Sequence, residues 1–135
     1  MNDGIRKLYE RWLLDMWAGD FALAHDLVTP GFVGHWPGHD VRGAAELADV
    51  LAQGHAPFTD VTVTLDVGPI VDGDTVAARW TFAGSYRGGL DGATAPAGTR
   101  VAFSGHDILR VEGGRVAEYW VISDVRTFAR SLGMG

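Results

Sequence analysis

The chain has 135 residues, a formal net charge of -6 and no cysteine. This length is typical of one domain, so residues 1–135 are predicted to form a single domain without disulfides or thiolate metal sites. An acidic chain does not suit a phosphate backbone, which argues against nucleic acid as a partner. No apolar run approaches the ~20 residues that span a bilayer, and the N-terminus lacks the apolar stretch of a signal peptide. We therefore expect a cytoplasmic protein with no membrane partner.

The first third of the sequence has the apolar spacing of helices. From Ile5 to Trp17, apolar residues recur at intervals of three and four positions, and Gly19 ends this run. The glycine-rich segment GHWPGHDVRG, at residues 34–43, is predicted to be a loop. The expected helices span residues 5–17, 20–28 and 44–53.

After Pro57, β-branched and aromatic residues predominate and the pattern becomes that of strands. Gly113 and Gly114 separate the last two strands and predict a hairpin. The segment RGGLDGATAPAG, at residues 87–98, is predicted to be a mobile loop at the rim of a pocket. Helices followed by an antiparallel meander indicate an α+β fold, with the helices packed on one face of a curved antiparallel sheet around one pocket. The expected strands span residues 61–67, 75–86, 100–111 and 116–125.

Several strings in this order resemble the SnoaL-like polyketide cyclases, in the branch often called ester cyclases. They are VGHWPGHDVRG, FTDVTVTL, GDTVAARWTFAGSYRG and PAGTRVAFSGHDILRVEGGRVAEYWVISD, and together they cover most of the chain. The resemblance implies the cone-shaped nuclear transport factor 2-like fold, which ketosteroid isomerase and scytalone dehydratase share. It also implies a domain without cofactor or metal, in which the interior of the cone holds the ligand.

Asp124 is the first catalytic candidate, because it ends the string EYWVISD where the resemblance implies the general acid/base aspartate. Strand alternation places Trp120, Ile122 and Asp124 on one face. A carboxylate beside apolar side chains loses hydration, so its pKa is expected to rise. The alternative is that Asp124 caps the tail that begins at Val125.

His106 is the second candidate, and its position depends on the register of the last hairpin. A turn of three residues pairs His106 with Trp120 and places His106 on the face of Asp124. A turn of two residues pairs His106 with Val121 and places Asp107 there instead, because a slip of one residue reverses every side chain. We choose His106 because a histidine transfers protons readily near pH 7.

His35 is the third candidate. The resemblance places it where ketosteroid isomerases carry their general-base aspartate. His35, His39 and Asp40 also suggest a site with two histidines and one carboxylate for a metal ion. The spacing within a loop fixes no ligand geometry, so no metal is predicted.

The sequence contains five tryptophans, and most fall on elements that would line a cone. Aromatic side chains on the inner face of a sheet form a flat wall for a fused-ring ligand, which predicts a small hydrophobic or aromatic substrate. The helical tryptophans are equally well explained as plain core. The predicted substrate-binding residues are Trp12, Met16, Trp36, Trp80, Phe82, Trp120 and Ile122.

The leading functional hypothesis is an enzyme of polyketide cyclase type, which closes a ring by an intramolecular aldol reaction on a polyketide or similar polycyclic carbonyl substrate. Asp124 would remove a proton next to one carbonyl, and His106 or His35 would stabilise the developing oxyanion. One alternative is an epoxide hydrolase, dehydratase or isomerase on the same fold. Another is a non-catalytic ligand-binding domain.

A sheet with helices on one face leaves its other face open. We therefore expect a homodimer or homotetramer formed through the outer face of the sheet, with Tyr119, Val121 and either Val101 or Ala102 as apolar surface.

Overall fold

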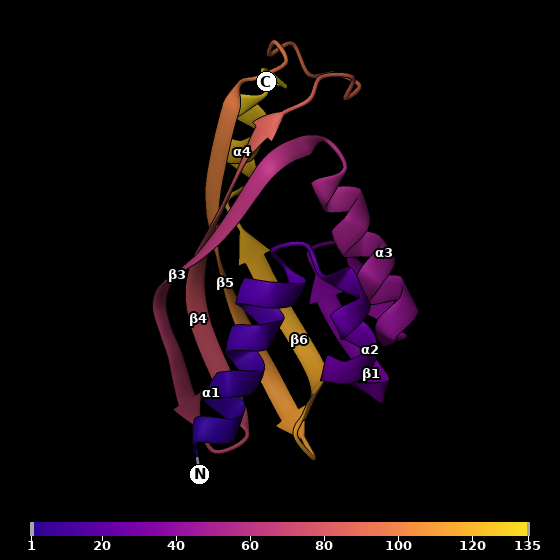
Figure 1. Cartoon of the computed structure of the whole chain (residues 1–135), viewed down its shortest axis with the longest axis vertical. Helices are drawn as coiled ribbons and strands as arrows, with labels where there is room; N and C mark the ends of the chain where they lie inside the picture. Colours follow the sequence, from indigo (N-terminus) through magenta and orange to yellow (C-terminus); the bar gives the residue numbers. More distant parts are fainter. Residues whose placement is uncertain (1, 135) are drawn as a thin grey trace.

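In a computed structural model, which describes residues 2–134, the N-terminal helices pack on one face of a curved six-stranded sheet (Figure 1). The helical elements are α1 (Asn2–Glu10), the π-helical turns η1 (Arg11–Met16), the 3-10 turn η2 (Phe21–Leu23), α2 (Ala24–Leu27), α3 (Gly43–His55) and α4 (Val125–Ser131). The strands are β1 (Val28–Trp36), β2 (His39–Arg42), β3 (Phe58–Asp72), β4 (Thr75–Tyr86), β5 (Arg100–Glu112) and β6 (Arg115–Ser123). The α+β class and the cone-like arrangement predicted from the sequence are confirmed.

The strands lie in the order β2-β1-β6-β5-β4-β3, and β1 runs parallel to β6. The sheet is therefore mixed, and the expectation of a wholly antiparallel sheet is wrong. The difference arises because β1 and β2 form at residues 28–42, where no strand was expected and residues 34–43 were expected to be a loop. Here Trp36 pairs with His39 across a tight turn, and Gly38 supplies the positive φ of 90° that the turn needs.

The first helix buries the apolar stripe that its spacing predicts. Tyr9, Trp12 and Met16 are completely buried against the sheet, and Leu8 and Leu13 are almost so. Large side chains of this kind contribute roughly 1.5–3 kcal/mol each when they leave water. This stripe is the main attachment of the N-terminal segment to the sheet.

The β5–β6 hairpin has a register that neither expected turn produces. Gly113 and Gly114 form the turn, and Glu112 pairs with Arg115. A bulge between positions 110 and 111 then shifts the register by one residue. As a result His106 pairs with Ile122, not with residue 120 or 121.

This register decides which side chains face the helices. Asp107 and Leu109 point inward and are buried, as are Tyr119 and Val121. His106 and Ile122 point to the outer face, which the N-terminal helices leave uncovered. Tyr119 and Val121 therefore cannot supply the outer apolar surface expected from the sequence.

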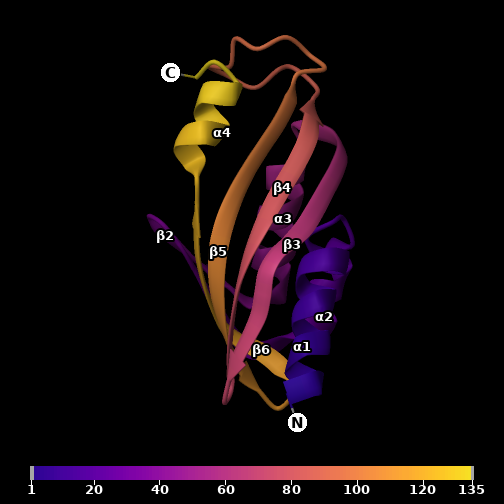
Figure 2. The same cartoon turned by 90° about the vertical axis from the view of Figure 1, so that its left-hand side faces the viewer.

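The chain leaves the sheet at Ser123, where a strand to residue 125 was expected. Helix α4 follows at once and lies beside the part of β5 that extends past the end of β6 (Figure 2). The backbone N–H of Asp124 donates to the carbonyl of Ser104, which fixes the start of this helix on β5. At the other end of α4, the carbonyl of Leu132 accepts hydrogen bonds from Thr94 and Ala95 in the long β4–β5 connection.

Candidate functional site

A cavity of about 200 Å³ lies between α3, α4 and the inner face of the sheet. Its walls are almost entirely apolar, and His55 is the one titratable side chain among its lining residues. Phe128 of α4 packs edge-on against Phe103 of β5, with ring centroids 5.1 Å apart, and helps to enclose the space. Six aromatic side chains form most of the wall: Trp17, Trp36, Phe58, Phe82, Phe103 and Phe128.

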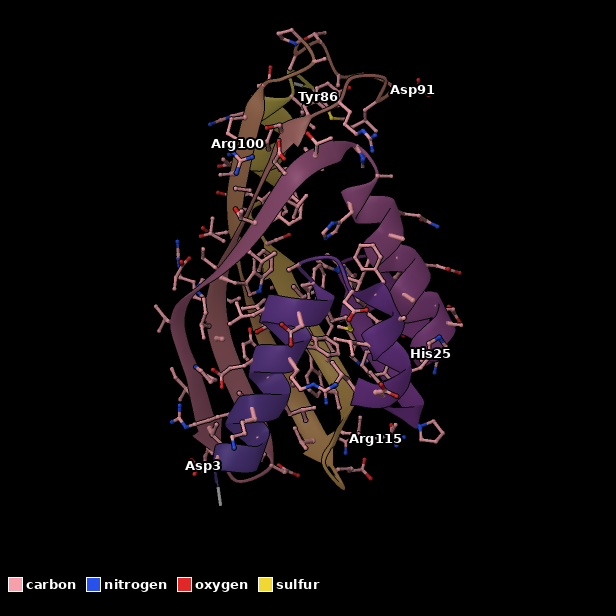
Figure 3. The ribbon with its side chains drawn as sticks, in the orientation of Figure 1. Asp3, His25, Tyr86, Asp91, Arg100 and Arg115 are labelled. Atoms are coloured by element: carbon pink, nitrogen blue, oxygen red, sulfur yellow. The ribbon has the colours of Figure 1, made fainter. Side chains whose placement is uncertain are left out.

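Side chains fill the space between the sheet and the helices along the length of the molecule (Figure 3). Tyr86 and Asp91 lie toward the end that carries the β4–β5 connection, and the hydroxyl of Tyr86 accepts a hydrogen bond of 2.7 Å from the backbone of Leu90 (Figure 3). This contact holds the beginning of the connection against the end of β4.

A second aromatic layer adjoins the cavity. The rings of Trp17 and Trp80 are stacked with centroids 6.2 Å apart. Trp80 lies over Gly105, where a Cβ atom would collide with the indole ring. Glycine at position 105 is therefore what allows the Trp80 ring to lie flat against β5.

Asp107 lies beyond Trp80 on the same inner face of β5. It is only 2% exposed, and the hydroxyl of Tyr9 donates a hydrogen bond of 2.8 Å to its Oδ1. Its Oδ2 is buried without a hydrogen-bond partner. Burial raises the pKa of Asp107 to about 7, although the Tyr9 hydroxyl and the nearby Trp80 indole N–H act in the opposite direction. The Trp80 N–H nevertheless has no partner in good hydrogen-bonding geometry.

Two buried phenols surround this carboxyl. Burial and the charge of Asp107 both raise the pKa of Tyr9, so its hydroxyl keeps its proton. The hydroxyl of Tyr119 is buried without a partner, and burial likewise raises its pKa. The arrangement brings together one carboxyl and two O–H donors in an apolar core. A carboxyl can transfer protons, and O–H donors can stabilise an oxyanion.

Asp124 occupies a different environment from the one expected. It is exposed, and it caps α4 by accepting hydrogen bonds from the backbone N–H of Thr127 at 3.0 Å and from the Thr127 hydroxyl at 2.7 Å. The bond from the Thr127 hydroxyl has the larger effect, and together the two bonds lower the pKa of Asp124. The increase in pKa expected from the sequence is therefore wrong. Asp124 is in this position because helix α4 begins at Val125, directly after β6, where the sequence indicated only a tail.

His35 and His106 both lie on the outer face. His35 contacts two carboxylates, Glu118 at 2.7 Å and Asp40 at 3.0 Å, and its ring stacks on Trp120. The Glu118 contact, followed by Asp40, raises the pKa of His35 and favours the imidazolium form. His106 shares this face but is exposed. The three residues predicted as catalytic thus lie on the side of the sheet opposite the cavity, or beyond the end of β6.

The predicted substrate-binding residues divide into three groups. Trp36 and Phe82 line the cavity, and Trp80 forms the layer next to it. Trp12 and Met16 are buried completely in the core between helix and sheet. Trp120 and Ile122 are 39% and 70% exposed on the outer face. The bulge in the hairpin accounts for the exposure of Trp120 and Ile122, because it shifts the register by one residue and so turns these side chains to the outer face.

Sequence reasoning overlooked His55, which follows the predicted third helix and has no neighbouring motif. His106 was preferred to Asp107 because the ordinary pKa of a histidine is close to neutral pH. The effect of burial on the pKa of Asp107 was not considered. The pattern around Asp107 offered one indication, since an acidic residue alternates there with Leu109 and Val111 on the buried face.

Within residues 2–134, no helix combines the length and apolarity needed to cross a bilayer. In the same range no three acidic or histidine side chains are grouped as metal ligands.

The profile of the SnoaL-like polyketide cyclase family matches residues 7–132. The chain belongs to this family. No curated protein sequence matches it significantly. Among solved structures, TsrD from Streptomyces laurentii is 28% identical, with a TM-score of 0.81, and the match covers 98% of this chain and 96% of TsrD. IdmH from Streptomyces antibioticus, a proposed polyketide cyclase, is 29% identical with a TM-score of 0.76, and the match covers 97% and 96% of the two chains.

A protein from Catenulispora acidiphila with a ketosteroid isomerase-like fold has a TM-score of 0.77 at 17% identity, and the match covers 96% of this chain and 94% of that one. At this identity the likeness concerns the fold alone. The resemblance identified from the sequence strings is therefore confirmed at the level of family and fold.

The buried carboxyl predicts a specific dependence of stability on pH. The pKa of Asp107 is about 7 in the folded chain against an ordinary value of 3.8. Between these values the unfolded chain has lost the proton and the folded chain has kept it, so the free energy of unfolding falls as pH rises. Asp107→Asn removes this contribution. The variant should therefore gain stability relative to the parent chain between about pH 4 and about pH 8, as measured by urea denaturation. If the difference in free energy of unfolding between the variant and the parent chain is the same at both pH values, the burial of a titrating carboxyl is contradicted.

Proposed function

We propose that this SnoaL-like family member catalyses ring closure of a polyketide or similar carbonyl compound by acid/base chemistry, with Asp107 as the proton carrier. The observation that supports this is the buried Asp107 carboxyl, bonded to Tyr9 through one oxygen and unpaired at the other. Its pKa of about 7 suits a group that must both take up and return a proton near neutral pH. The sequence-based choice of Asp124 as proton carrier gives way to Asp107, because Asp124 is engaged in capping α4.

In the proposed reaction, the Asp107 carboxylate removes a proton from the carbon next to a carbonyl. The resulting enolate attacks a second carbonyl of the same molecule, and one carbon–carbon bond forms. The new alkoxide then takes the proton back from Asp107, so the enzyme ends in its starting state. The unpaired hydroxyl of Tyr119 is placed to donate to a developing oxyanion, and Tyr9 orients the carboxyl.

The aromatic cavity supports the other requirement, which is to hold a flexible chain with its reacting carbons close together. Because the Trp17–Trp80 stack lies between the cavity and Asp107, the proposal requires these two rings to part when substrate enters. The same stack favours a second candidate function, in which the cavity binds an aromatic ligand and no reaction follows.

The test is turnover of a synthetic aryl-substituted 1,5-diketone, whose aldol closure gives a cyclic β-hydroxyketone of the same mass that liquid chromatography separates from the substrate. Asp107→Asn should retain the fold, because the amide can still accept from Tyr9, and should lower turnover by ~100-fold or more. Asp124→Asn makes the same chemical change at an exposed position and is the matched control. It should leave turnover unaltered.

Full turnover in a folded Asp107→Asn variant would exclude Asp107 as the proton carrier. Loss of turnover in the Asp124 control alone would restore the sequence-based choice. Absence of any acceleration by the parent chain, together with tight binding of an aromatic ligand, would favour the non-catalytic candidate.

We also propose that two copies of the chain associate through the outer face of the sheet. Ile108, Trp120 and Ile122 are 46%, 39% and 70% exposed there, around a hollow of about 430 Å³. Of the charged groups beside it, Glu118 contacts both His35 and Arg110. A second copy seated on Ile108, Trp120 and Ile122 would therefore bury apolar side chains while this group of charges stays paired.

Ile122→Glu places a charge in the middle of this face and should convert a dimer to a monomer of 14.5 kDa with an unchanged circular dichroism spectrum. Ile70→Glu is the matched control, because Ile70 is 59% exposed but lies on the edge strand β3. Light scattering measures the mass of both variants. A parent chain that is already monomeric at micromolar concentration would contradict the proposal.

A further inference from the structure

His55 lies at the end of α3, and its imidazole forms part of the cavity wall. Two phenyl rings meet it edge-on, Phe21 with centroids 4.7 Å apart and Phe82 at 5.5 Å. Its Nε2 lies 2.7 Å from the backbone carbonyl oxygen of Trp17, the residue whose ring stacks on Trp80. The imidazole is therefore held in a fixed orientation by three neighbouring elements.

This hydrogen bond determines the tautomer of His55. A carbonyl oxygen only accepts, so Nε2 must carry the proton that it donates. Burial lowers the pKa of His55, which keeps the ring neutral at pH 7. In the neutral ring the other nitrogen, Nδ1, then has a free lone pair.

Nδ1 has no hydrogen-bond partner among residues 2–134, and it is not one of the polar atoms sealed within the core. Every other side chain of the cavity wall is apolar or, as in the tryptophans, a donor. Nδ1 is therefore the one acceptor without a partner among the side chains that line the cavity.

We propose that Nδ1 of His55 accepts a hydrogen bond from a hydroxyl group of the ligand, so that the cavity selects a phenol or enol of one or two fused rings. This inference rests on the proposed use of the cavity as the substrate site, but it does not depend on Asp107 as proton carrier. It narrows the substrate from any polyketide to one that presents an enolised or phenolic O–H.

The size of the ligand follows from the volume of the cavity. A cavity of roughly 150 Å³ in a protein core accommodates a benzene molecule. The cavity here measures about 200 Å³, which suits one substituted ring or a compact pair of fused rings. A linear system of three or four rings does not fit unless the walls move apart.

Selection for the hydroxyl follows from the cost of leaving a polar group unpaired. A site with a placed acceptor rejects the analogue that lacks the donor, because burying the acceptor without a partner costs more than the missing contact itself. The aromatic walls, by contrast, contact a ligand with or without the hydroxyl to a similar extent.

The experiment compares 1-naphthol with naphthalene by equilibrium dialysis at pH 7. The parent chain should bind 1-naphthol at least about tenfold more tightly, as one hydrogen bond of ordinary strength provides. In His55→Phe this preference should fall to about twofold or less. Phenylalanine keeps an aromatic ring in the cavity wall and offers no acceptor, whereas the amide oxygen of a glutamine would supply a new one. His25→Phe is the matched control, since His25 is exposed on α2 (Figure 3), and it should keep the full preference.

A preference for 1-naphthol that survives in His55→Phe would overturn the proposal. If that variant does not fold, 1-methoxynaphthalene serves with the parent chain, because it has the oxygen but no proton to donate. It should bind no more tightly than naphthalene, and binding equal to that of 1-naphthol would overturn the proposal. Asp107→Asn should keep the preference for 1-naphthol, so a failure of the catalytic proposal and a failure of the binding proposal give different results.

Discussion

The hydrogen bond between Tyr9 and Asp107 connects the first helix to the middle of β5, across the apolar core of the cone. A carboxylate in such surroundings loses its hydration, and a protein core tolerates it only when hydrogen bonds or protonation replace the lost water. Here one oxygen has a phenol and the other has no partner. The carboxyl responds through its pKa, which reaches about 7. Much of the proposed chemistry depends on this one buried group.

The same strands build two quite different surfaces. On the inner face, Phe103, Gly105 and Asp107 follow one another along β5 and lead from the cavity to the carboxyl. On the outer face, the alternate residues include His106 and Ile108, which face away from the helices. Side chains alternate without a break along β5, and the bulge opposite residues 110 and 111, in β6, then turns Tyr119 inward and Trp120 outward. The aromatic cavity and the open apolar face are therefore consequences of one register.

The sequence supported the family, the fold class and the inward-facing helix, since these depend on local spacing and on strings that extend over most of the chain. The helix at residues 43–55 and the strand at 75–86 were recognisable for the same reason. The site was harder to predict. His106 and Asp107 are adjacent, and which of them is buried depends on which face of β5 the helices cover, which local spacing does not reveal. Asp124 and His55 depended on contacts with Thr127 and Trp17, and for His55 that partner is far away in the sequence.

The central claim is that Asp107 titrates near neutral pH within the folded chain. Carbon-13 NMR of the side-chain carboxyl groups measures this directly, with the Asp107 resonance assigned by its absence from Asp107→Asn. The account predicts a titration midpoint of about 7 for Asp107, well above the ordinary value of 3.8. Asp124 should titrate on the other side of that ordinary value, because its contacts with Thr127 lower its pKa. A midpoint for Asp107 near the ordinary value of 3.8 would contradict it, because burial would then not be raising the pKa of this carboxyl.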